Sequence, residues 1–467
     1  MSLKKPTALQ LFNKKLNKKY VLNLFNENIL DGSSRGIDGL TAEKFNENIE
    51  ENLKTILKKC KKGNYKFSRY LELLKSKGRE SKPRLISLPT VRDKIVLLVL
   101  KEFLHEIYKD CVNHKLPNHY IRELRELLKK SNPLDDYFYK GDISDFYGSI
   151  KHEKLLKILQ KRIKSKLIIR LIHEAIRNHT VSMHYKRSSI KGIKLIKGVP
   201  QGLSISNILA NIYLKDLDKH FKKTKINYFR YVDDILLLIS NSQLNSNEKK
   251  LKFLLDELDL TLNPDKRDYK SCSEGIDYLG YQISQKGVSV RKATVERFIR
   301  SISSMFSNFK HGKSKRIERH PWLNENLLKE IFVSELNEKI TGALSENKRY
   351  GWIFYFMEID DISLLFKLDL IIEEFFGRLE EFKNCSPVNL KGLVRAHFEA
   401  KFKPYGGYIH NYNIYKTISQ KLEYLRNLGY INPKRSKPYS TDEIEKLFLR
   451  IRKRHLDQLD LDVGTMS

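Results

Sequence analysis

Hydrophobic residues recur along this chain with two different periods, and the period changes near residue 288. Before that point, short apolar or alternating runs typical of strands lie between helical stretches. After it, helical spacing dominates to the end, with expected breaks at residues 310–316, 403–407 and 433–435. The pattern predicts an α+β N-terminal part followed by an α-helical C-terminal part.

Several elements can be placed more closely. Thr41 is a suitable N-cap for a helix that continues to about Lys62. A basic hairpin is expected from residues 65–73 and 82–89, joined by a Lys-rich turn. Single strands are expected over residues 137–143 and 278–283. Further helices are expected over residues 1–30, 93–108, 152–178 (one helix or a pair), 204–221 and 248–260.

The sequence Tyr231-Val232-Asp233-Asp234 interrupts two runs rich in apolar and aromatic residues, which predicts a hairpin with its acids at the tip. Adjacent carboxylates repel, so a cation is their natural partner near a protein interior. Oxygen ligands favour Mg²⁺ or Mn²⁺ over zinc. Taken alone, these four residues also fit a solvated acidic turn.

A third carboxylate, Asp142, follows the expected strand at residues 137–143. If that strand and the hairpin are neighbours in one sheet, the three acids meet at its edge. Two metal ions roughly 3.5–4 Å apart can bridge such acids and support in-line nucleotidyl transfer. Asp145 is expected to cap a helix or to face solvent.

Composition points to a polyanionic partner. The chain of 467 residues has 88 Lys and Arg against 56 Asp and Glu, a net charge of +32, which favours nucleic acid first and an acidic membrane face second. It has no long apolar run and no secretory signal pattern, so no membrane span and a cytoplasmic location are expected. The four cysteines are far apart, which predicts reduced thiols without a zinc site.

Seven short segments of the chain, among them those that contain Asp142, Asp233 and Asp234, resemble the ordered motifs of reverse transcriptases, in particular group II intron and related bacterial enzymes. The resemblance covers about residues 30–285. Its motifs occur in the family's order at residues 36–39, 82–93, 142–147, 198–207, 231–234, 262–266 and 278–281.

The resemblance implies a right-hand polymerase fold. Fingers and palm, with an antiparallel sheet, would occupy residues 1–287. An α-helical thumb would follow at residues 288–345. An α-helical, RNA-binding C-terminal region would occupy residues 346–467, where aromatic residues from Phe398 to Tyr415 are interleaved with lysines. About half of those rings are expected in the core instead.

The resemblance also implies roles for the catalytic residues. Asp142, Asp233 and Asp234 would hold two Mg²⁺ ions, with Mn²⁺ as the alternative. Lys266 would donate a proton to the departing pyrophosphate, or else is a solvated lysine.

Other residues would bind substrate. Lys82 and Arg84 would contact the triphosphate, or alternatively the RNA backbone. Tyr147 would form a wall that excludes a 2′-hydroxyl, or else is a core tyrosine. Gln201 and Gly202 would approach the nucleotide and template. The residues expected to bind nucleic acid are Tyr278, Leu279, Gly280, Lys313, Lys315 and Arg316.

Differences from the motifs of particular reverse transcriptases limit which members of the family the chain resembles. Residues 278–280 occupy the place of a Val-Thr-Gly triplet in retron enzymes, which argues against a typical retron. The Cys/His-rich endonuclease segment of mobile intron proteins has no counterpart here. The chain is therefore most similar to stand-alone, defence-associated reverse transcriptases, which act against phage and often copy a dedicated noncoding RNA.

The expected function is RNA-directed DNA synthesis from dNTPs on an RNA template, extending a primer or a protein hydroxyl. A protein partner or a homo-oligomer is possible within this hypothesis. One alternative is a template-independent or protein-primed DNA polymerase on the same palm. Another is a catalytically idle RNA-binding scaffold, against which the three retained acids argue.

Overall fold

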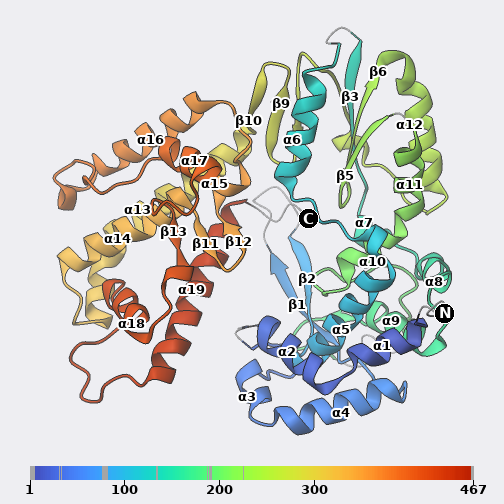
Figure 1. Ribbon diagram of the computed structural model, residues 1–467, viewed down its shortest axis with the longest axis horizontal. Helices are drawn as coiled ribbons and strands as arrows, with labels where there is room; N and C mark the ends of the chain where they lie inside the picture. The colour runs from blue at the N-terminus through green and yellow to red at the C-terminus, as the bar shows by residue number, and fades with distance from the viewer. Residues whose placement is uncertain are drawn as a thin grey trace, which may run out of the picture. The chain divides into compact units, whose positions relative to one another are not determined.

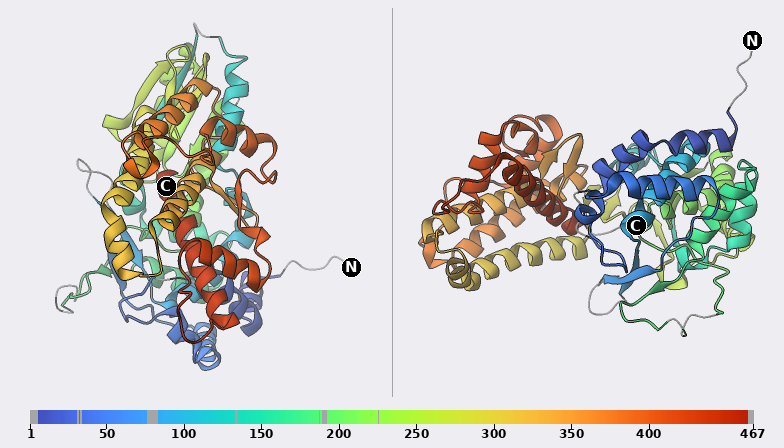
Figure 2. Two further views of the ribbon diagram at one scale, coloured as in Figure 1. Left: turned by 90° about the vertical axis from the view of Figure 1, so that its left-hand side faces the viewer. Right: turned by 90° about the horizontal axis from the view of Figure 1, so that it is seen from below.

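The computed structural model describes residues 6–30, 32, 34–75, 83–132, 135–186, 188, 192–224 and 226–463. The chain divides into two compact units, whose courses are shown in Figures 1 and 2. The N-terminal unit comprises Met1–His114 and Tyr137–Tyr269, and the C-terminal unit comprises Lys115–Asp136 and Lys270–Ser467. This division falls at residue 269, and the expected thumb and RNA-binding regions stay predictions.

Helices dominate the N-terminal unit. They are α1 (Ala8–Lys15), α2 (Lys18–Asn28), α3 (Ala42–Asn46), α4 (Ile49–Lys61), α5 (Val91–Ile107), α7 (Phe146–Ser149), α8 (His152–Gln160), α9 (Lys166–Ile176), α10 (Ser206–Tyr213), α11 (Lys215–Lys223) and α12 (Asn241–Asp256). The strands are β1 (Tyr70–Lys75), β2 (Arg84–Leu88), β3 (Asp136–Asp142), β4 (Thr180–Val181), β5 (Asn227–Tyr231), β6 (Asp234–Ser240) and β7 (Asp268–Ser271). The division between the units passes within β3 and β7.

Three expected helices are each interrupted once. Thr41 does cap a helix, because its hydroxyl accepts the Lys44 amide hydrogen at 3.2 Å. That helix ends after one turn, and α4 restarts beyond Asn48, whose backbone is not helical. The helix expected over residues 204–221 likewise divides at Leu214 into α10 and α11, and the N-terminal helix divides into α1 and α2. Hydrophobic periodicity continues across such short breaks, which is why it did not reveal them.

A four-stranded sheet in the order β5-β6-β3-β7 carries the predicted acids. The strands β5 and β6 form an antiparallel hairpin in which Tyr231 faces Asp234. The middle of β6, residues 235–239, is buried throughout, as expected for a central strand covered on both faces. In Figure 1, α11 and α12 lie beside this hairpin, and α12 packs against β6.

The predicted basic hairpin is confirmed as β1 and β2, which pair antiparallel from Leu71 with Leu88 to Lys75 with Arg84. The short strand β4 adds to β1 in parallel. Most of the expected Lys-rich turn, and Lys82 at the expected start of the second strand, lie outside the described residues.

The core of the N-terminal unit surrounds α5. Its residues 95–100 are all buried, as a helix that is apolar on every side requires. Asp93 in its first turn is fully buried and accepts hydrogen bonds from the Tyr65 hydroxyl at 2.6 Å and the Ser68 amide at 3.0 Å. These bonds fix α5 against the segment that leads into β1.

The C-terminal unit is mainly helical but contains two small sheets. Its helices are α6 (Pro117–Leu128), α13 (Lys292–Arg319), α14 (Glu325–Thr341), α15 (Trp352–Tyr355), α16 (Ile362–Phe376), α17 (Leu393–Phe402), α18 (Ile418–Asn427) and α19 (Thr441–Val463). Strands β8 (Ile276–Tyr278), β9 (Tyr281–Ser284) and β10 (Gly287–Val290) form a sheet in the order β10-β9-β8. Strands β11 (Ala343–Ser345), β12 (Lys348–Tyr350) and β13 (His410–Asn411) form the other, in the order β12-β11-β13.

Two sequence expectations about this unit are wrong. Residues 278–283 are a hairpin rather than one strand, because Leu279 and Gly280 turn the chain with φ of 49° and 82°. Helix α13 runs unbroken through residues 310–316. The cost of Gly312 within it, about 1 kcal/mol relative to alanine, is offset by Phe309 and Ile317, which pack, partly buried, against the apolar core of the unit. The region is mainly helical, as expected, and the short strands β11 to β13 lie within it.

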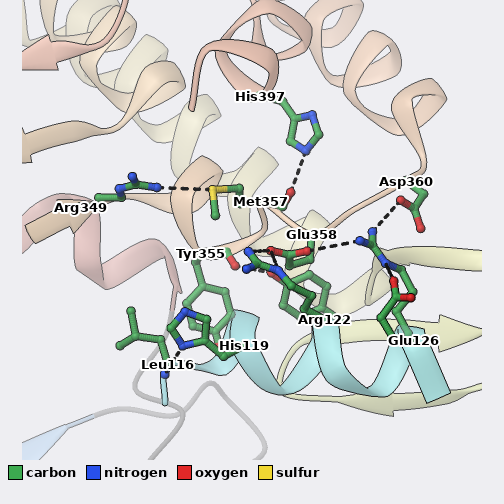
Figure 3. Close-up of polar contacts among 12 residues, drawn as sticks. Leu116, His119, Arg122, Glu126, Arg349, Tyr355, Met357, Glu358, Asp360 and His397 are labelled. Atoms are coloured by element: carbon green, nitrogen blue, oxygen red, sulfur yellow. Dashed lines mark hydrogen bonds and ion pairs between the residues drawn. The ribbon is translucent and has the colours of Figure 1, made fainter. Parts of the chain in front are cut away.

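Helix α6 is anchored within the C-terminal unit by a buried carboxylate, drawn in Figure 3. Glu358 is 1% exposed and accepts a hydrogen bond from Arg122 Nε at 3.1 Å, while Arg125 Nη2 lies 3.7 Å from its other oxygen. Arg125 also bonds Asp360 at 3.0 Å. A buried charge needs such partners, since removing them leaves it neither solvated nor paired.

Among the described residues, no helix combines the length and the apolar character needed to cross a lipid bilayer.

We expect Glu358→Gln to lower the free energy of unfolding of the C-terminal unit by about 1–3 kcal/mol, because hydrogen bonds to a charged group are lost from a buried position. Urea unfolding followed by circular dichroism measures the change. The matched control is Glu126→Gln on α6, an exposed partner of Lys129 whose loss should cost little. Equal stability of the Glu358→Gln variant and the control would contradict the anchoring role.

Candidate active site

Asp142 is the last residue of β3, and hydrogen bonds to the loop at residues 261–266 hold the backbone around it. Its carbonyl accepts the Asn263 amide at 2.7 Å, and the Ser144 amide bonds Thr261 at 2.8 Å. Its carboxylate, 13% exposed, accepts a hydrogen bond from Lys266 Nζ at 2.8 Å. The loop at residues 261–266 therefore places a lysine directly on this acid.

The hairpin tip is a two-residue turn held in a strained conformation. Val232 has φ of 57°, which is unfavourable for a β-branched residue, and its side chain is buried. Arg230 Nη1 donates to the Val232 carbonyl at 2.7 Å, and Arg230 Nε donates to Asp218 at 2.7 Å. Arg230 thus ties the turn to α11, within an otherwise apolar strand.

The structure brings the tip and the end of β3 together. The Ile143 amide bonds the Asp233 carbonyl at 3.3 Å. Burial, followed by the negative charge of Asp142 and then that of Asp234, raises the pKa of Asp233 to about 6. Although burial opposes it, the hydrogen bond to Asp142 and the charges of the three acids raise the pKa of Lys266. The acidic side chains thus lie close together at one edge of the sheet, as the sequence predicts.

The donor chemistry of this strand edge suits a divalent metal ion. In the part of the chain that the structure describes, no three His, Cys, Asp or Glu side chains are arranged to hold a metal ion together. The available donors are nevertheless carboxylate oxygens, which Mg²⁺ and Mn²⁺ prefer. Burial first, and then the negative charge of Asp142 and Asp234, raises the pKa of Asp233, and a bound cation would offset both effects. These carboxylates therefore suit a divalent metal ion. In this structure, the Lys266 ammonium is the cation beside Asp142.

Tyr147 and Arg84 belong to the same neighbourhood. Burial and then the charge of Asp233 raise the pKa of Tyr147 to about 12, against the opposing positive charges of Arg84 and Arg230. The Tyr147 carbonyl accepts the Val199 amide at 2.8 Å. An aromatic ring thus lies between the acids and the strand that carries Arg84.

Gln201 and Gly202 are held against β2. The Ser87 amide donates to the Gln201 carbonyl at 2.7 Å. Gly202 has φ of 100°, and a Cβ there would lie 2.7 Å from the Ile86 side chain and 3.0 Å from the Ser87 carbonyl oxygen. Only glycine permits this approach of the two backbones. Asp145 is exposed at the N-cap position of α7.

The remaining predicted residues lie in the C-terminal unit. Tyr278 and Leu279 are buried, 1% and 2% exposed, and Gly280 completes the turn between β8 and β9. Lys313 pairs with Glu381 at 2.6 Å and with Glu325 at 3.1 Å. Arg316 lies 3.9 Å from Glu335, and Lys315 is exposed on the same helix. The assignment of these residues to nucleic-acid binding stays a prediction.

Two supporting residues were missed from the sequence. Arg230 secures the tip, and a charged residue inside an apolar strand was the available signal. His152 is 3% exposed and its Nε2 lies 2.7 Å from the Gly198 carbonyl oxygen, which holds the start of the glycine-rich turn. No sequence pattern singles out that histidine.

Known proteins resemble the middle of this chain. Residues 73–283 match the family model described as reverse transcriptase (RNA-dependent DNA polymerase). Group II intron-encoded protein LtrA of Lactococcus lactis subsp. cremoris is 27% identical over 203 residues, covering 42% of this chain and 32% of that protein. Protein YkfC of Escherichia coli (strain K12) is 22% identical over 298 residues, covering 54% and 76%.

A yeast relative is also covered only in part. The putative COX1/OXI3 intron 2 protein of Saccharomyces cerevisiae is 25% identical over 318 residues, covering 54% of this chain and 36% of that protein. The chain thus spans about a third of the length of the LtrA and yeast relatives. The structure of apo telomerase from Candida tropicalis aligns over 91% of this chain and 78% of that one, at 16% identity and a TM-score of 0.39. That score is too low to support an argument, so the fold description rests on the strand pairings above.

Asp233 should make the metal-free protein less stable as pH rises. Because its pKa is raised to about 6 in the folded state, the proton it holds stabilises the fold at low pH, and this contribution is lost as pH rises through 6. In EDTA, we expect Asp233→Asn to stabilise the N-terminal unit at pH 8 by about 2 kcal/mol and to have no effect near pH 3.5. Urea unfolding at both pH values measures this, with the exposed Asp265→Asn as control. Lower stability of Asp233→Asn at pH 8 would contradict the electrostatic description.

Proposed function

We propose that the whole protein is an RNA-directed DNA polymerase, and that its residues 73–283, which match the reverse transcriptase family model, form a bacterial reverse transcriptase domain of the group II intron-like lineage. The observation that carries the proposal is the convergence of Asp142 and the Tyr231–Asp234 turn at one sheet edge, where the Ile143 amide bonds the Asp233 carbonyl and where burial and then the charge of Asp142 raise the pKa of Asp233. Three acids held against their own repulsion serve little purpose in a passive RNA-binding scaffold.

Asp142, Asp233 and Asp234 are the residues that would hold the metal ions, with two Mg²⁺ as the expected cofactors. Such ions lower the pKa of an attacking hydroxyl and stabilise the charge on the leaving oxygen. In the reaction, the primer 3′-oxygen forms a bond to the α-phosphorus of a dNTP as the bond from that phosphorus to the bridging oxygen breaks. The hydroxyl proton goes to solvent, and pyrophosphate leaves.

Lys266 is suited to donate a proton to the departing pyrophosphate. Its Nζ lies 2.8 Å from Asp142 and is therefore already at the reacting centre. The carboxylates that raise its pKa keep it protonated until their charge is neutralised. A lysine controlled in this way holds its proton in the ground state and releases it only when negative charge develops on the leaving group.

The substrate pocket follows from the neighbours of the acids. Arg84, with Lys82 outside the described residues, would bind the triphosphate, since a guanidinium donates two parallel hydrogen bonds to phosphate oxygens. Tyr147 would close the pocket below the sugar. Gly202 brings its loop against β2, and Gln201 and Gly202 would approach the nucleotide and template from there.

The RNA template would extend over an aromatic surface of the C-terminal unit. Phe398, Phe402 and Tyr405 are 51%, 63% and 68% exposed, and the two phenylalanine rings lie 5.0 Å apart. Exposed rings beside Lys401 and Lys403 suit stacking on unpaired bases. Tyr412, by contrast, is buried and belongs to the core.

We further propose that the template is a dedicated, structured noncoding RNA and that the synthesis serves phage defence. The aromatic surface, with Lys401 and Lys403 beside it, lies outside the matched residues 73–283 and would offer RNA a contact surface beyond the palm. The alternative on the same palm is template-independent or protein-primed synthesis. RNA isolated with the protein from cells identifies the template.

Primer extension with purified protein tests the central proposal. We expect Asp234→Asn to abolish dNTP incorporation, by a factor of at least about 10³, because a metal-binding charge is lost. The control Asp265→Asn removes an exposed acid one loop away and should retain activity. Sequencing the product, with and without the bound RNA, separates the alternatives: a random or homopolymeric product without RNA contradicts templated synthesis. Undiminished synthesis by Asp234→Asn contradicts polymerisation at this site.

Tyr147 should select against ribonucleotides. We expect Tyr147→Val to raise kcat/KM for rNTPs relative to dNTPs by about tenfold or more, because removing the ring admits a 2′-hydroxyl. Tyr147→Phe is the matched control, since it keeps the ring and removes only its hydroxyl, and its selectivity should equal that of the wild type. Single-nucleotide incorporation measures both. Unchanged selectivity of Tyr147→Val would assign the ring to packing alone.

A further inference from the structure

The C-terminal unit contains a cavity that the proposed polymerase chemistry does not use. It has a volume of about 470 Å³ and lies among α13, α14 and α19, which pack against one another within that unit in Figures 1 and 2. Each helix contributes residues at three- and four-residue spacing, so the cavity follows the helix faces. Its volume is in the range of small-molecule sites, about 300–1,000 Å³.

One wall of the cavity is apolar and partly aromatic. It is formed by Met305, Phe309, Leu328, Phe332 and Leu459. The rings of Phe309 and Phe332 stack with their centroids 4.6 Å apart. Such a wall suits a flat heterocycle, because aromatic and thioether groups pack well on a ring face.

Two acids reach the cavity and differ in their surroundings. Glu338 is buried and bound within the protein: it accepts hydrogen bonds from the Tyr412 hydroxyl at 2.7 Å and contacts His455 Nδ1 at 3.2 Å. Glu335 is about one-third exposed and its nearest cation, Arg316, is 3.9 Å away. Glu338 therefore has a structural role, whereas Glu335 keeps capacity to accept hydrogen bonds from a ligand.

Basic side chains outnumber these acids around the opening. Lys313, Arg316, Lys339 and Arg454 all contribute to the lining. Some already pair with acids on the protein, as Lys313 does with Glu381, but such surface pairs are weak and exchange partners at little cost. An anion at the opening would gain several charge-assisted hydrogen bonds.

Gly312 widens the cavity at the middle of α13. A Cβ at this position would meet no atom within 4 Å, so the space beside it is open. The glycine is helical and needs no unusual backbone conformation. A side chain can therefore be introduced here without backbone strain, and alanine should even favour the helix.

We propose that this cavity binds a mononucleotide, with its base against Phe309 and Phe332 and its phosphate among Lys313, Arg316 and Arg454. The carboxylate of Glu335 accepts N–H donors from the edge of the base, for which guanine offers two. The ligand is either a free nucleotide or a single nucleotide turned out of a bound strand. This site is separate from the palm residues, and the inference does not rest on the polymerase proposal.

Binding of guanosine 5′-monophosphate to the full chain tests the site. The measurement is isothermal titration calorimetry in EDTA, which suppresses metal-dependent binding at the palm. We expect saturable binding by the wild type and by Gly312→Ala, whose dissociation constants should agree within twofold. Gly312→Phe should weaken binding at least tenfold, because its ring fills the cavity. Both variants should retain the wild-type melting temperature and primer-extension rate, which separates a failure here from a failure of the proposed polymerase.

Charge is tested by a matched pair on α13. Arg316→Ala should weaken binding about tenfold, whereas Arg319→Ala, which removes the same charge from an exposed position outside the cavity, should not. Glu335→Gln should reduce the preference for guanosine over uridine monophosphate. A short single-stranded oligonucleotide that displaces the nucleotide at lower concentration assigns the site to a strand, and a lack of displacement assigns it to free nucleotide.

Three results would overturn the proposal: no binding by the wild type, equal binding by Gly312→Phe and Gly312→Ala, or equal losses in Arg316→Ala and Arg319→Ala. The last result would mean that nucleotides bind the basic surface generally.

Discussion

The mutual repulsion of three carboxylates is the constraint around which the N-terminal unit is built. Asp142 ends one strand and Asp233 and Asp234 occupy the turn between two others, so the strand order β5-β6-β3 decides that they meet. The loop at residues 261–266 bonds the backbone of Asp142 and supplies Lys266. Arg230 holds the strained Val232 in place. These contacts concentrate negative charge at one edge, and the raised pKa of Asp233 is the electrostatic cost.

The sequence predicts those parts of this site whose structure is set by neighbouring residues in the chain. The hairpin around Asp233 and the strand ending at Asp142 are encoded by nearby residues, so both were predicted correctly. Arg230 and His152 act through partners far along the chain, Asp218 on α11 and Gly198 in the loop, and no local pattern indicates such contacts.

The errors in the C-terminal unit have a similar origin. A cluster of lysines around Gly312 predicts a loop, yet α13 continues because Phe309 and Ile317 on its other face pack, partly buried, against the apolar core of the unit. Conversely, residues 278–283 have the composition of one strand, but two left-handed residues turn it into a hairpin. Composition also could not separate the aromatic residues that pack inside, such as Tyr412, from those that remain exposed, such as Phe402. Tertiary packing overrides local preference in each case.

The anchoring of α6 has a consequence for modularity. This helix lies in the sequence between two segments of the N-terminal unit, yet it belongs to the compact unit that contains Glu358, more than 200 residues later. The two units are therefore interleaved rather than joined end to end. Deleting everything after β7 would remove the partners of the α6 arginines and expose the apolar face of α6. This helix lies immediately before the β-strand that carries Asp142.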